Sequence, residues 1–175
     1  MFPVTQSHGA SFAVSFFLRS TQESGLVFQL KRREQEFFSL YLQNGTFHVD
    51  VQASACSSSR YITDGNKHFL TVSVINGWVF FNEEGVRFQE EDTLPAITVD
   101  AGDQAFIGGL AQGLDTSRWG GYFKGCLQDI RLDHTQLFIY KTKTTKYMKQ
   151  HHPSYLPGAS FNVEPNCVSD DTCKV

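Results

Sequence analysis

Apolar and polar residues alternate with a period of two in several short stretches of this chain. The clearest are residues 37–42, 46–51 and 68–75, in which every second side chain is a large apolar one. Because successive side chains of a strand point to opposite faces of a sheet, this period predicts half-buried strands. Stretches of similar length and apolar character lie at 11–18, 25–30, 78–81, 104–107 and 126–132, and 137–140 is a further candidate.

Turn signals separate these stretches. Asn44-Gly45 and Asn76-Gly77 each stand between two of them, and this dipeptide is a strong predictor of a two-residue hairpin turn. The charged residues 31–36 and residues 82–85 predict further turns, and the small residues 53–60 predict a loop. No window shows an apolar period of 3.6, so we expect little helix. Many short strands with frequent turns predict an all-β sandwich or barrel.

The composition agrees with one globular domain and argues against some classes of function. The chain has 175 residues, of which 41% are apolar, 19% charged and 16 Phe, so it can bury a core that favours sheet. A net charge of −3 gives no reason to expect nucleic-acid binding. No apolar run approaches the ~18 residues that would insert into a bilayer. No secretory leader precedes the first strand, so we expect a segment of a longer chain.

Five stretches in sequence order resemble a laminin G-like domain, an antiparallel two-sheet jelly-roll sandwich of concanavalin-like type found in extracellular proteins. They are residues 14–19, 25–28, 37–45, 64–68, and the pair of Ile107-Gly108-Gly109 and Gly125-Cys126. The chain departs from the family at Lys67-His68, where Trp-His is usual. The resemblance implies a domain over 1–167. Residues 168–175 would be a linker and the start of an EGF-like module, an arrangement similar to that in Crumbs-type polarity proteins.

The resemblance also implies a disulfide between Cys126 and Cys167, with two buried thiols as the alternative. Cys173 would belong to the following module. Cys56 is left without an assigned partner, and a bridge from Cys56 to Cys173 stays open. Disulfides persist in oxidising compartments, so we expect an extracellular location, either secreted or in the ectodomain of a membrane protein.

A calcium site at one rim of the sandwich is a further property that the resemblance implies. The side-chain ligands would be Glu36 and Asp100, and the backbone carbonyls those of Ala53 and Thr98. Oxygen donors suit calcium, but Glu36 stands where the family has Asp, so we expect at best a weak site. The alternative is that Glu36 and Asp100 are ordinary solvated carboxylates.

Three features are candidates for surface chemistry. A basic strip that would attract sulfated glycosaminoglycan comprises Lys141, Lys143, Lys146 and Lys149; its alternative is a solvated charged loop. Arg118 and Trp119 lie in a glycine-rich loop and would form a protein-binding hot spot, unless Trp119 is tucked against the sheet with Arg118 stacked over it. Asn44-Gly45-Thr46 is the one N-glycosylation sequon of the chain.

The sequence carries no catalytic motif. Gly-x-Ser-x-Gly, His-Glu-x-x-His and a phosphate-binding loop are all missing, and the six His are scattered. We therefore expect a non-catalytic extracellular adhesion or receptor module that binds a protein or glycan partner through loops on one rim. Calcium is its one candidate cofactor. The alternatives are a structural spacer between neighbouring modules and, less favoured by the many Phe, a small-molecule carrier.

Overall fold

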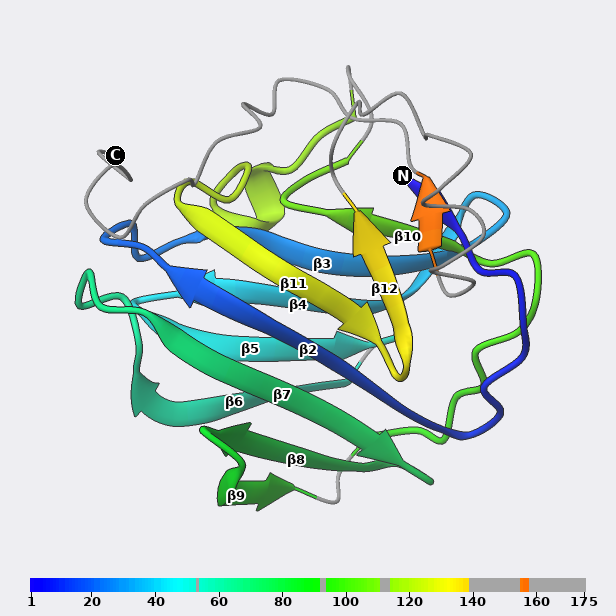
Figure 1. The fold of residues 1–175 in the computed structure, drawn as a ribbon, viewed down its shortest axis with the longest axis horizontal. Coiled ribbons are helices and arrows are strands. Elements are labelled where there is room, and N and C mark those ends of the chain that lie inside the picture. Colours follow the sequence, from blue (N-terminus) through cyan, green and yellow to red (C-terminus); the bar gives the residue numbers. More distant parts are fainter. Residues whose placement is uncertain (53, 92–93, 111–113, 139–154, 158–175) are drawn as a thin grey trace.

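Two β-sheets lie face to face in the computed structural model, which describes all residues except 53, 92–93, 111–113, 139–154 and 158–175 (Figure 1). The first sheet has the order β1-β10-β3-β4-β5-β6, with bounds Phe2–Pro3, Gln104–Ile107, Gly25–Arg32, Gln35–Gln43, Thr46–Val51 and Ser54–Tyr61. The second has the order β13-β12-β11-β2-β7-β8-β9, with bounds Tyr155–Pro157, Thr135–Phe138, Cys126–Leu132, Ser11–Arg19, His68–Ile75, Trp78–Glu83 and Val86–Glu91. A short 3₁₀ helix, η1, covers Ser117–Trp119. The predicted all-β antiparallel sandwich is confirmed.

The core lies between the two sheets and is rich in aromatic rings. Phe16 of β2 meets Phe47 of β5 edge to face at 5.8 Å, and Phe12 of β2 meets Phe38 of β4 at 5.3 Å. All four side chains are at most 3% exposed. Edge-to-face pairs add about 0.5–1.5 kcal/mol each beyond the burial of their area. The alternating stretches of the sequence thus supply the contact between the layers.

The hairpins follow the predicted turn chemistry. Asn44 and Gly45 have φ of 52° and 76°, and Asn76 and Gly77 have φ of 51° and 90°. Two successive positive φ values match a turn twisted like its flanking strands. The charged segment 31–36 forms a shorter turn than we expected, because β3 and β4 extend into it and leave only Arg33 and Glu34 between them.

Residues 53–60 were predicted to be a loop, and this was wrong for residues 54–60, the part that the structure describes. They contribute most of β6, whose residues pair with β5, and Cys56 and Ser58 point into the interior. Small hydroxyl-bearing residues give a weak strand signal, so the pairing with β5 decides the conformation. The sequence reading also missed β9, and β12 begins at Thr135 rather than at 137.

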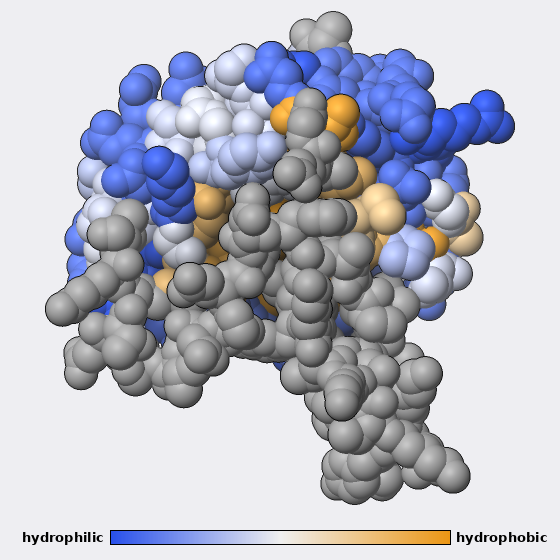
Figure 2. Space-filling view, turned by 90° about the horizontal axis from the view of Figure 1, so that it is seen from above, coloured by the Kyte–Doolittle hydropathy of each residue, from blue (hydrophilic) through white to orange (hydrophobic). Residues whose placement is uncertain are grey.

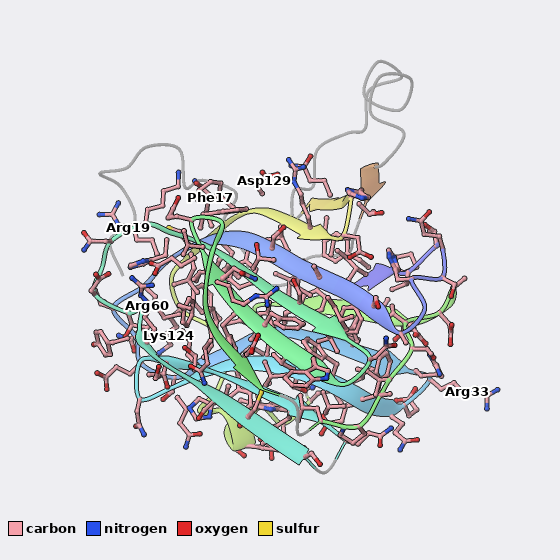
Figure 3. All side chains as sticks on the ribbon, turned by 90° about the horizontal axis from the view of Figure 1, so that it is seen from below. Phe17, Arg19, Arg33, Arg60, Lys124 and Asp129 are labelled. Atoms are coloured by element: carbon pink, nitrogen blue, oxygen red, sulfur yellow. The ribbon has the colours of Figure 1, made fainter. Side chains whose placement is uncertain are left out.

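The sandwich has two rims, one at each end of β4. The first rim, where β4 begins, carries residues 33–34, 76–77 and 98–103. The second rim, where β4 ends, carries residues 20–24, 44–45, 61–67 and 120–125. In Figure 3, Arg33 lies at one end of the molecule, and Arg19, Arg60 and Lys124 lie at the other. The described surface is mainly hydrophilic in the view of Figure 2, with hydrophobic colour in small areas.

Candidate functional site

A guanidinium occupies the centre of the first rim. Arg32, the last residue of β3, donates from Nε to Asp103 Oδ1 at 2.8 Å. Its Nη2 nitrogen donates to Asp103 Oδ2 at 2.9 Å, to Asp100 Oδ2 at 2.7 Å and to the Thr98 carbonyl at 3.0 Å. Burial alone would raise the pKa of Asp103, but hydrogen bonds from Arg32 and from the Asp100 N–H outweigh it and lower that pKa. The carboxylate therefore stays ionised and paired.

The predicted calcium ligands do not fit a metal as they are placed. Thr98 and Asp100 do come together, but around Arg32. Glu36 is engaged by another arginine, Arg118, and Ala53 lies outside the described residues. Among the residues that the structure describes, no group of three or more His, Cys, Asp or Glu is arranged to hold a metal ion.

Arg118 joins strands that are far apart in the sequence. Its guanidinium donates to Glu36 on β4 and, at 2.9 Å, to Asp50 on β5. It also lies 5.0 Å from the ring centroid of Trp119. Burial and then the Asp50 charge raise the pKa of Tyr41, whose hydroxyl donates to Asp50, to about 12. These contacts pin η1 to the outer face of the first sheet.

Trp119 is not an exposed contact residue. It is 4% exposed and packs with Leu26 and Tyr41 in a small second core, so it cannot offer its ring to a partner. The prediction that Trp119 is a protein-binding hot spot is therefore wrong. The alternative arrangement is found, in which Trp119 is tucked against the sheet and Arg118 lies over its indole. Arg118 keeps half of its side chain exposed, at 51%, while it neutralises Glu36 and Asp50.

A polar hollow lies on the second rim, between the β2–β3 loop and the segment before β11. Its lining residues are Thr21, Gln22, Glu23, Ser24, Gly120, Tyr122 and Lys124. The two segments are tied together, because the Ser20 hydroxyl donates to the Lys124 carbonyl at 2.7 Å and the Leu26 N–H donates to the Gly121 carbonyl at 3.0 Å. A Cβ at Gly25 would lie 2.8 Å from the Tyr122 carbonyl, so this approach requires glycine.

Exposed tyrosines flank the hollow. Tyr122 is 46% exposed and Tyr61, from the end of β6, is 51% exposed. The Tyr61 hydroxyl donates to Glu23 Oε1 at 3.1 Å, and the Gly45 N–H donates to the Glu23 carbonyl at 3.0 Å. The hollow thus brings hydroxyl, amide, carboxylate, phenol and ammonium groups onto one preorganised surface, which suits a polar ligand.

A charged network supports the same rim. His68, the first residue of β7, bridges Glu83 Oε1 at 2.5 Å and Asp64 Oδ1 at 2.8 Å, and Arg60 Nε lies 2.7 Å from Glu83 Oε2. Burial would lower the pKa of His68, but the two carboxylates raise it overall. The hydrogen bond from His68 lowers the pKa of Asp64 to about 2. The 61–67 loop is therefore fixed to β8.

The sequon also lies on the second rim. Asn44 is exposed at the tip of the β4–β5 hairpin, and the Thr46 hydroxyl donates to the Gln43 carbonyl at 3.1 Å. A Cβ at Gly45 would collide with the Tyr61 ring, so the hairpin tip and Tyr61 are closely packed. A glycan on Asn44 would share this rim with the hollow.

Several predicted residues lie outside the described part of the chain. These are Lys141, Lys143, Lys146, Lys149, Cys167 and Cys173. Cys126, the first residue of β11, is buried and takes part in a disulfide. The alternative of a buried free thiol is therefore excluded for Cys126. Its pairing with Cys167 stays a prediction, and so does the separate bridge between Cys56 and Cys173.

Comparison with known families decides the identity of this sandwich. The family model described as "Laminin G domain" matches residues 18–135 of the 175 in the chain. The chain belongs to the laminin G domain family. Laminin G domains are non-catalytic modules of extracellular proteins and of membrane-protein ectodomains, where they bind proteins or glycans, and members of the family can bind calcium.

Two curated relatives of this laminin G domain are Crumbs proteins. It is 28% identical to mouse "Protein crumbs homolog 1" over 99% of its own length and 12% of that protein, and 29% identical to human "Protein crumbs homolog 2" over 94% and 11%. The chain therefore spans about an eighth of the length of these relatives. The solved structure of mouse laminin alpha1 chain domains LG4-5 has a TM-score of 0.66 and 21% identity, covering 77% of this chain and 39% of that one, which shows the shared fold.

Sequence reasoning missed the main polar features of both rims of this laminin G domain, namely Arg32 on the first rim and the hollow on the second. Arg32 lay within a segment interpreted only as a charged turn, and the residues of the hollow carry no motif. The one available signal was an arginine two residues beyond the predicted strand 25–30. Within the described residues, no helix has the length and apolar character needed to cross a membrane.

Proposed function

We propose that this laminin G domain is a non-catalytic adhesion or receptor module, displayed outside the cell, that binds a protein or glycan partner at its second rim. The observation that carries the proposal is the polar hollow flanked by Tyr61 and Tyr122. Tyrosine is enriched at binding surfaces because it combines a large contact area with a hydroxyl and few rotatable bonds. Lys124, exposed at the hollow, adds a positive charge.

Preorganisation supports this assignment. The loops around the hollow are held by main-chain and side-chain hydrogen bonds and by the His68 network, so binding would order few further groups. The first rim has fewer polar groups available to a partner, because the carboxylates of Asp100 and Asp103 are already paired with Arg32.

The basic strip extends the proposal toward glycans. Four lysines in residues 141–149 would attract sulfate groups of glycosaminoglycan as point charges. We expect the chain to bind a heparin column and to elute only above physiological ionic strength. Elution near physiological ionic strength would indicate that the strip is an ordinary solvated loop. The same proposal places the domain at 1–167, stapled by Cys126–Cys167, with residues 168–175 leading into an EGF-like module.

A cell-binding experiment tests the function. The chain, tetramerised on a fluorescent streptavidin carrier, is applied to mammalian cells, before and after surface trypsin and before and after heparin lyase. We expect saturable staining that is lost after one of the two treatments, which distinguishes a protein from a glycosaminoglycan partner. Repeating the assay with chelator and with millimolar calcium reports whether calcium assists. Absence of saturable staining in every arm would favour the spacer and contradict the proposal.

A further inference from the structure

The oxygen atoms around Arg32 form the kind of donor set that a divalent cation takes. Two carboxylate oxygens of Asp103, one of Asp100 and the Thr98 carbonyl oxygen all lie within 3.0 Å of its Nε or Nη2 nitrogens. Three of them converge on the single Nη2 nitrogen. Calcium prefers such hard oxygen ligands, with water completing a shell of about 6–8.

The guanidinium is held in this position from more than one side. Its planar fork meets the Asp103 carboxylate bidentately, and its Cζ atom lies 5.3 Å from the ring centroid of Phe37. Asp103 is only 2% exposed, so displacement of Arg32 would leave a buried carboxylate without its cation. Arginine stays protonated at every physiological pH, so its charge cannot leave by losing a proton.

The loop itself is arranged to present these oxygens. The Asp100 N–H donates to Asp103 Oδ2 at 2.8 Å, and the Asp103 N–H donates to the Asp100 carbonyl at 3.1 Å. Ser7 and Thr98 hydroxyls donate to the two oxygens of the Asp100 carboxylate, at 3.0 and 3.1 Å. A fixed pair of acids facing one cation is thus built into the fold.

We infer that Arg32 is the resident cation of this rim and takes the place that calcium would have. Two predicted calcium ligands, Thr98 and Asp100, bind its guanidinium, and Glu36 is neutralised separately by Arg118. A calcium ion at these oxygens would bring two positive charges against the guanidinium. The rim is therefore ordered without calcium, and removing Arg32 uncovers a latent calcium site.

Thermal unfolding with and without calcium tests this inference, and it needs no binding partner, so its outcome is independent of the proposed function. For the wild-type chain we expect the same Tm in chelator and in calcium up to about 10 mM. Arg32→Ala should lower Tm in chelator by about 5 °C, because Asp100 and Asp103 lose their shared cation. Calcium, but not magnesium, should restore about half of that loss in a saturable manner.

Arg131→Ala is the matched control. Arg131 has the same 47% side-chain exposure as Arg32 and binds the single carboxylate of Asp129. This variant should show no calcium response. Arg32→Lys, which keeps the charge and loses the fork, should show an intermediate Tm and no calcium response.

Two results would overturn the inference. One is calcium binding by the wild-type chain, seen as calorimetric heat at millimolar calcium with a rise in Tm. The other is an Arg32→Ala variant as stable as wild type and indifferent to calcium. If Arg32→Ala fails to fold in chelator, it is purified in calcium instead. Folding that is rescued by calcium supports the inference. Failure to fold in both conditions, while Arg32→Lys folds, contradicts the latent site.

Discussion

The side-chain amide of Gln89 on β9 accepts a hydrogen bond from the backbone N–H of Ser59 on β6 at 2.8 Å. The same amide donates to the Ser57 carbonyl at 2.7 Å. β6 and β9 are edge strands, each at one end of its sheet. The Gln89 side chain therefore makes hydrogen bonds to β6 of the kind that a neighbouring strand would make, at the point where the two sheet edges meet. Exposed edges invite pairing with other chains, and Gln89 satisfies part of this one.

Gln89→Ala should open this edge. Loss of the hydrogen bonds between Gln89 and residues Ser57 and Ser59, on a partly solvated edge, should lower the free energy of unfolding by about 1–2 kcal/mol, measured by urea denaturation. Amide exchange at Ser59 should also accelerate. Gln35→Ala, at an exposed position on β4, is the control and should behave as wild type. Unchanged exchange at Ser59 in the Gln89 variant would show that the bond is not formed in solution.

Trp119→Ala should be the most destabilising change on the outer face of the first sheet. The indole is buried against Leu26 and Tyr41, so its removal leaves a cavity that costs about 3–4 kcal/mol. Trp78→Ala removes the other tryptophan, which is 43% exposed, and should cost less than about 1 kcal/mol. Urea denaturation followed by circular dichroism gives both values. Equal effects at the two positions would contradict the burial of Trp119.

Arg118→Ala should destabilise by about 1–2 kcal/mol, because Glu36 and Asp50 lose a cation that is itself half exposed. Tryptophan fluorescence should shift to longer wavelength as η1 loosens over Trp119. The same variant in a Trp119→Phe background should produce no such shift. A shift that persists there would trace the effect to Trp78.

Stability should depend on pH through His68. Because the folded-state pKa of His68 is raised above its usual 6.5, its contribution is fully present below pH 6.5 and is lost as pH rises through the folded-state pKa. His68→Gln should flatten the dependence of Tm on pH between about 6 and 8. His134→Gln, in the exposed turn between β11 and β12, should leave it unchanged. An identical pH profile in wild type and His68→Gln would show that the imidazole is not paired.

The sequon prediction is tested in a secreting mammalian cell line. Thr46→Ala should abolish the mass shift removed by peptide N-glycosidase, whereas Thr46→Ser keeps both the hydroxyl and the sequon. Since Asn44 shares the second rim with the hollow, loss of the glycan should also raise cell binding. A wild-type chain secreted without the mass shift would refute glycosylation at Asn44.

The strands with alternating or largely apolar residues could be predicted from the sequence, and β6, which is made of small and polar residues, could not. Residues 46–51 place Phe47, Val49 and Val51 on one face, and they form β5 as expected. β6 has only small residues on its buried face, so its conformation comes from pairing with β5 and from Gln89. The rims were harder still, because Arg118 meets Glu36 across 82 positions and Arg32 meets Asp103 across 71. No local pattern encodes such encounters.

A matched pair of charge reversals tests the proposed binding surface most directly. Lys124→Glu changes the exposed cation at the hollow on the second rim, and Arg33→Glu makes the same change at the opposite end of the molecule (Figure 3). We expect Lys124→Glu to weaken saturable cell binding by about tenfold, while Arg33→Glu binds as wild type and both variants keep the wild-type Tm. Equal binding by the two variants, or a loss confined to Arg33→Glu, would contradict a partner site on the second rim.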